Sequence, residues 1–74
     1  MTLPDIKAVL EEAGFERVAT YRFFNKASGI QAKVWWTYAL NGDRSYVVWI
    51  NNLNSFAERI VCYDLPSLRK AVGL

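Results

Sequence analysis

The chain has 74 residues, of which 53% are hydrophobic and 15% aromatic, and its formal net charge is +2. This length is that of a single domain, residues 1–74, whose thin core large aromatic side chains help to fill. One cysteine and no histidine exclude an intrachain disulfide and the usual zinc-ligand sets. Because no apolar run reaches the length of a membrane span and the N-terminus lacks signal-peptide features, we expect a cytoplasmic protein that has no membrane contact. We also expect no cofactor.

The first residues have the pattern of a capped helix. Thr2 is an N-cap residue, and Asp5 follows three positions later, as in a capping box. Apolar residues then recur at helical spacing until Gly14, a typical residue just beyond a helix end. These features predict a helix over about residues 3–13.

The middle of the chain changes to aromatic and β-branched residues, in runs separated by turn residues. The predicted strands are Phe15–Phe24, Ile30–Leu40, Arg44–Asn51 and Glu58–Tyr63. Residues 51–55 have the composition of a loop, and a helical turn over 56–59 is an alternative to the start of the fourth strand.

The end of the chain repeats the capping chemistry of its start. Asp64 precedes a Leu-Pro pair and an aliphatic residue, and Gly73 ends the pattern, which predicts a second helix over about residues 65–72. The order predicts an α+β fold, in which a three- to four-stranded antiparallel meander sheet carries the N- and C-terminal helices on one face.

The turn at Asn41–Asp43 sets the pairing of the two long strands. A two-residue Asn41-Gly42 turn would place Trp36 beside Val47, whereas a three-residue loop would place Trp36 beside Val48. We favour the three-residue loop, because it gathers the large aliphatic side chains on one face.

Each long strand has two faces of different character. The predicted core face of the first carries Ile30, Ala32, Val34, Trp36, Tyr38 and Leu40. On the opposite face we place Lys33, Trp35, Thr37, Val47 and Trp49, with Arg22, Arg59, Val61 and Tyr63 as neighbours. The tryptophans on this face could pack beneath the helices or a terminal segment, form a homodimer or partner interface, or stack nucleobases.

The sequence contains no pattern typical of a catalytic site. The glycines all fall at expected turns or helix ends, so there is no phosphate-binding loop. Glu11 and Glu12 fall on the solvent side of the first helix, and Cys62 fits a buried position in a strand. We therefore expect a protein that is not an enzyme.

Two terminal segments, Ile6–Glu16 and Asp64–Leu74, resemble those of HicA-type toxins of toxin–antitoxin pairs. The resemblance implies a fold similar to double-stranded-RNA-binding domains. The catalytic histidine of that family would fall near Thr20–Phe24, and this chain has none, so the RNase activity is not implied.

Taken together, these features predict a small binding protein that engages a protein partner. In size it resembles small regulators and inhibitors of phages and mobile elements, such as anti-CRISPR proteins. The alternatives are a toxin–antitoxin-related protein, a homodimer, or a nucleic-acid-binding module that uses the aromatic and basic sheet face. The candidate binding residues are Arg22, Lys33, Trp35, Trp49, Arg59 and Tyr63.

Overall fold

The computed structural model of the protein describes residues 1–52 and 59–74. Its elements are α1 (Leu3–Glu12), β1 (Glu16–Ala19), β2 (Arg22–Asn25), β3 (Ile30–Tyr38), β4 (Arg44–Asn52), β5 (Ile60–Cys62) and α2 (Leu65–Ala71). Most of the predicted loop over 51–55, most of the alternative helical turn over 56–59 and the first residue of the predicted fourth strand lie outside the described residues.

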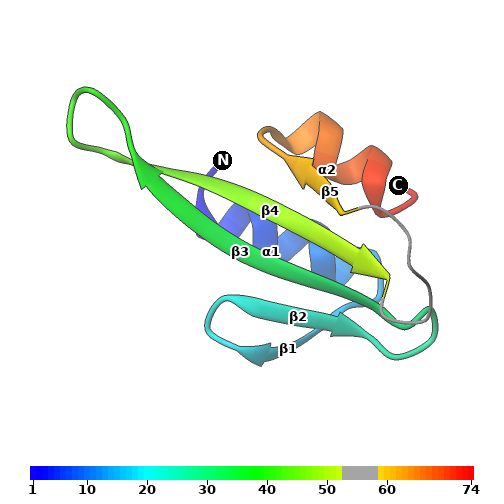
Figure 1. Ribbon diagram of the computed structural model, residues 1–74. Helices are drawn as coiled ribbons and strands as arrows, with labels where there is room; N and C mark the ends of the chain where they lie inside the picture. The colour runs from blue at the N-terminus through cyan, green and yellow to red at the C-terminus, as the bar shows by residue number, and fades with distance from the viewer. Residues whose placement is uncertain (53–58) are drawn as a thin grey trace.

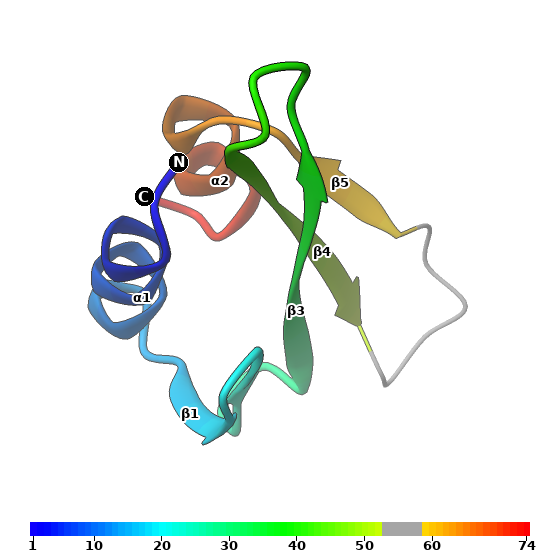
Figure 2. The ribbon, with the colours of Figure 1, turned by 90° about the vertical axis from the view of Figure 1, so that its left-hand side faces the viewer.

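The strands form one antiparallel sheet in the order β1-β2-β3-β4-β5. Both helices lie on the same face of this sheet (Figures 1 and 2), and an ion pair of 3.1 Å between Arg69 and Glu12 joins them. The predicted α+β meander with its two helices on one face is therefore confirmed.

The helix ends follow from local chemistry. The Thr2 hydroxyl accepts a hydrogen bond from the Asp5 N–H at 3.3 Å, and the Asp64 carboxylate accepts one from the Ser67 N–H at 2.8 Å. Gly14 follows α1 with a φ of 92°, a left-handed conformation that favours glycine. Both predicted helices are thus confirmed to within a residue of their expected ends.

The core lies between the sheet and the helices. It is entirely apolar among the described residues and comprises Ile6, Val9, Leu10, Phe15, Phe23, Ala32, Val34, Val48, Ile50, Cys62 and Leu68. Its sheet residues alternate along each strand, as a sheet buried on one face requires.

The predicted single strand Phe15–Phe24 is two strands joined by a turn at Thr20 and Tyr21. No glycine or proline marks this turn, which explains why the sequence pattern missed it. Contacts with β3 stabilise it: the Tyr21 carbonyl accepts a hydrogen bond from the Val34 N–H at 2.7 Å, and the Tyr21 ring lies 4.7 Å from the Trp36 ring.

Both predicted pairings of the long strands are wrong, since Trp36 lies opposite Tyr46 rather than Val47 or Val48. Hydrogen bonds from the Ala39 N–H to the Asp43 carbonyl at 2.7 Å and from the Gly42 N–H to the Ala39 carbonyl at 2.9 Å close the loop. Gly42 adopts a φ of 86°, as in three-residue hairpin loops that end in a left-handed residue.

The observed register nevertheless differs from the favoured one by an even number of positions. Because side chains alternate with a period of two, this shift keeps every residue on its predicted face. The outer face therefore carries Lys33, Trp35, Thr37, Val47 and Trp49, as expected.

The predicted core face of β3 is wrong at its far end. Tyr38 is 67% exposed and Leu40 is fully exposed, because the β3–β4 hairpin projects beyond the helices (Figure 1). A strand of nine residues spans about 30 Å, whereas a ten-residue helix spans only about 15 Å. The helices are therefore too short to cover the hairpin tip.

Candidate functional site

The outer face of the sheet, opposite the helices, is the main candidate site. No described helix or terminus covers it (Figure 2), and Trp35 is 45% exposed while Val47, Trp49 and Val61 are half-buried. Packing of these tryptophans beneath the helices is therefore excluded within the described residues.

A row of aromatic rings crosses β3 and β4. The Trp35 and Trp49 rings stack with their centroids 6.3 Å apart and their planes at 19°. The Trp35 ring also stacks on Trp36 at 5.4 Å and 26°, although the two residues alternate along the strand.

Two cations lie over the rings of Trp35 and Trp49, and a third, Arg44, lies over the Trp36 ring at 5.2 Å. The Lys33 ammonium is 5.4 Å from the centroid of the Trp35 ring and 5.8 Å from that of Trp49. The Arg59 guanidinium carbon is 4.3 Å from the centroid of the Trp49 ring. Each such contact contributes about 0.5–1 kcal/mol at an exposed site, so cations and rings support one another's positions.

The structure brings together four of the six predicted site residues in this cluster and places a fifth beside it. Arg22 lies opposite Lys33 in the pairing of β2 with β3. Tyr63 is 71% exposed just beyond β5, and among the described residues no ring contact links it to either tryptophan. We call the resulting surface the tryptophan patch: Arg22, Lys33, Trp35, Val47, Trp49, Arg59 and Val61.

The patch is positively charged. Among the described strand residues of this face, one is acidic, Glu16 at the outer edge strand β1, and Asp43 lies in the loop at the hairpin tip. The ion pairs formed by described residues join Lys7 to Glu11 and Arg69 to Glu12, all four of them outside the patch. The cations of the patch thus have no carboxylate partner in the part of the chain that the structure describes.

A hollow of about 480 Å³ adjoins the patch, between the β1–β2 turn and β3. Arg22, Lys33 and Trp35 line it, together with Ala19, Thr20, Tyr21 and Val34. Its opening therefore combines an apolar wall with two cations, which suits an acidic side chain with an apolar neighbour.

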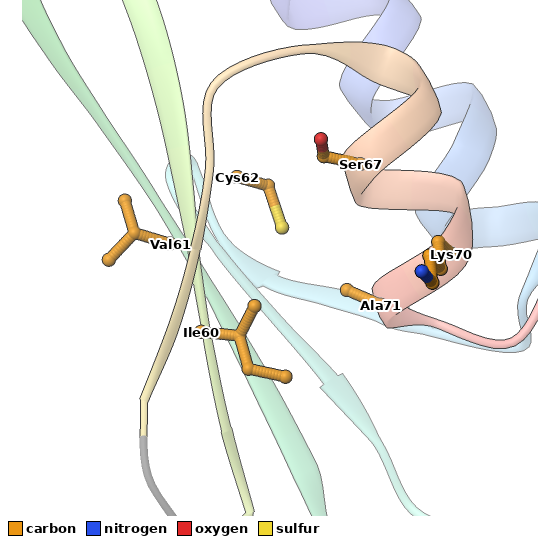
Figure 3. A pocket seen from close by; sticks show the side chains of 6 residues that line it. All are labelled: Ile60, Val61, Cys62, Ser67, Lys70 and Ala71. Carbon is orange, nitrogen blue, oxygen red and sulfur yellow. The ribbon is translucent and has the colours of Figure 1, made fainter.

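A second hollow, of about 470 Å³, lies between β5 and α2 (Figure 3). Its lining is Ile60, Val61, Cys62, Ser67, Lys70 and Ala71. Burial, and secondly the charge of Asp64, raise the pKa of the Cys62 thiol, so this cysteine is less ionised at neutral pH than a free one and is a poor nucleophile.

The described residues contain neither a metal-binding cluster nor a membrane-spanning helix. Across residues 1–52 and 59–74, no group of three or more histidine, cysteine or acidic side chains could hold a metal ion. Neither described helix has the length and apolar content needed to cross a bilayer.

Sequence reasoning missed the contribution of Trp36 and Tyr21, which extend the row of rings, and it missed the hollow beside α2. The longest predicted strand spans a greater distance than the predicted first helix, and this difference could have indicated that the helices leave the hairpin tip uncovered. No comparable signal marks the hollow, because it depends on how closely α2 approaches the end of the sheet.

No protein-family model, curated protein or solved structure matches this chain. The similarity of its ends to HicA-type toxins stays a prediction from the sequence.

Proposed function

We propose that this protein is a non-enzymatic binding protein whose tryptophan patch docks on an acidic and partly apolar surface of a protein partner. The observation that carries the proposal is a stacked tryptophan pair with cations over it, on a sheet face that no described element covers. By occupying that surface, the protein would act as a regulator or inhibitor, a role that fits its small size.

The composition of the patch supports a protein partner. Tryptophan and arginine are among the residues that carry most of the binding energy in protein interfaces. Lys33 and Arg59 are held over the rings before any partner arrives, so less side-chain entropy is lost on binding. The cations of the patch have no carboxylate partner among the described residues, so acidic groups on the partner would pair with them and speed the encounter.

Stacking of nucleobases is less compatible with this arrangement. A base needs a free ring face. Trp35 already contacts the rings of Trp36 and Trp49, and Trp49 contacts both Trp35 and the Arg59 guanidinium. These contacts compete with a stacked base for the surfaces of the rings. The net charge of +2 would also provide little attraction to phosphates at physiological salt.

A second copy of the chain is also a poor partner for this face. A two-fold interface places the same patch on both subunits, so Arg22, Lys33 and Arg59 of one copy would approach those of the other. The excess positive charge therefore favours a different protein with an acidic surface.

The test is affinity capture from nuclease-treated lysate of the native host. Wild type and Lys33→Glu are compared with Lys26→Glu, which makes the same charge change at an exposed turn residue outside the patch. We expect wild type and Lys26→Glu to retain a protein with an acidic surface. Lys33→Glu should weaken its binding by about tenfold or more, as loss of an interfacial charge pair does.

Two outcomes would count against the proposal. One is that Lys33→Glu binds the partner as tightly as wild type does, and the other is that lysate without nuclease treatment yields nucleic acid and no protein partner. A fluorescence titration separates the latter case further, since oligonucleotides at low salt should leave the tryptophan emission of the chain unchanged. Quenching that disappears as salt is added would instead favour a nucleic-acid-binding face.

A further inference from the structure

Among the described strands, β5 is an edge of the sheet. It pairs with β4 on one side, through Ile60, Val61 and Cys62, and no described strand lies on its other side. Backbone N–H and C=O groups along such an edge remain available to an additional strand.

The free edge of β5 borders the hollow beside α2. Figure 3 shows the side chains of Ile60 and Cys62 turned toward α2, whereas Val61 points away from the hollow. Ala71 faces the strand from the helix (Figure 3). The strand and the helix therefore form the two walls of an apolar groove, and Ile60 is 49% exposed in it.

One cation at this groove has no ion-pair partner among the described residues. Arg69 is paired with Glu12 at 3.1 Å, but the next residue, Lys70, lines the groove and forms no ion pair within residues 1–52 and 59–74. An occupant with a carboxylate near Lys70 would supply the missing anion.

We propose that the β5–α2 groove binds an extended, acidic peptide segment of a partner protein, which adds to the sheet as a strand beside β5. Main-chain hydrogen bonds to β5 would hold the peptide, an apolar side chain would contact Ile60 and Ala71, and a carboxylate would pair with Lys70. The site faces a different side from the tryptophan patch: the side chains of Ile60 and Cys62 point toward the groove, whereas that of Val61, which also borders the hollow, points away (Figure 3).

The dimensions fit this occupant. The volume of about 470 Å³ lies within the range of small ligand-binding pockets. Three strand residues span about 10 Å, so the peptide would pair over roughly three to four residues. A second copy of β5 is a weaker candidate for the added strand. The acid that it would bring next to the strand is Asp64, whose carboxylate is already engaged as the N-cap of α2.

The test selects ligands from a phage-displayed library of random ten-residue peptides against the full chain. We expect the selected peptides to share an acidic residue close to an apolar one. Lys70→Glu should weaken their binding by about tenfold, and Lys26→Glu should leave it unchanged. Lys70 is exposed, so the variant is expected to fold, which its thermal unfolding curve verifies.

Hydrogen exchange of the backbone amides then locates the bound peptide. We expect added protection at Ile60–Cys62 and no change around Trp35. Selection of no peptide, binding that tolerates Lys70→Glu, or protection confined to β3 would overturn the proposal. Protection of the β5 amides without any peptide, increasing with the concentration of the protein, would also overturn it, because a second copy would then be the occupant. Lys33→Glu changes the tryptophan patch and leaves this groove intact, whereas Lys70→Glu changes only the groove. The two variants therefore test the two proposed binding sites independently.

Discussion

At the scale of single residues, Asp64 connects β5 to the helix that forms the second wall of the groove. Hydrogen bonds from Ser67, first from its side chain and then from its backbone, lower the pKa of the Asp64 carboxyl below its ordinary value of 3.8. A lowered folded-state pKa means that the stabilising contribution is complete above the ordinary value. It is lost as the pH falls through the folded-state value.

We therefore expect α2 to lose stability in acid. As the pH is lowered from about 4, the protection of the α2 amides against hydrogen exchange, relative to the intrinsic rate at each pH, should decrease in the wild type. In Asp64→Asn it should change less, since asparagine caps a helix without titrating. Comparison of the two chains separates this carboxylate from the other acids, and identical pH profiles would contradict the assignment.

At the scale of elements, the β3–β4 hairpin depends on its loop. The Asn41 side chain accepts a hydrogen bond from the Asp43 N–H at 3.1 Å and donates one to the Asp43 carboxylate at 3.1 Å. The φ of Gly42 is 86°, and a Cβ added there would meet no atom within 4 Å. Any cost of a side chain at this position is therefore conformational and not steric crowding.

We expect Gly42→Ala to lower the free energy of unfolding by about 1–2 kcal/mol, the cost of a left-handed non-glycine residue. The measurement is urea denaturation followed by tryptophan fluorescence. Leu40→Ala is the matched control in the same loop, and because Leu40 is fully exposed, its effect should stay within about 0.5 kcal/mol. Equal effects of the two substitutions would show that the observed loop conformation is wrong.

At the scale of the whole molecule, the helices, the tryptophan patch and the β5–α2 groove divide the surface. The helices cover one face of the sheet (Figures 1 and 2). The patch occupies the other face, and the groove lies at the β5 edge. A partner could therefore occupy the patch and the groove together.

The charge of the patch leads us to expect a monomer of about 8.5 kDa at micromolar concentration and physiological salt, because like charges oppose a face-to-face dimer. Sedimentation equilibrium measures this directly. A dimer at low salt would contradict the charge argument, and Trp35→Ala would then show whether that dimer uses the patch.

Local chemistry made much of this protein predictable from its sequence. The caps at Thr2 and Asp64 and the glycines after each helix determined where the helices lie, since hydrogen bonds between near neighbours suffice to define a helix end. Alternation of side chains assigned Lys33, Trp35 and Trp49 to one face. This assignment stayed correct despite the error in register, because the error was an even number of positions and side chains alternate with a period of two.

Only the tertiary structure decided the features that join distant residues. The turn at Thr20 and Tyr21 is stabilised by β3, the exposure of Leu40 depends on where the helices stop, and Arg59 reaches Trp49 across the β4–β5 pair. The groove beside Lys70 exists because α2 packs near the edge of the sheet. Periodicity and capping describe contacts along the chain, whereas these features arise from contacts between segments that only the packed fold brings together.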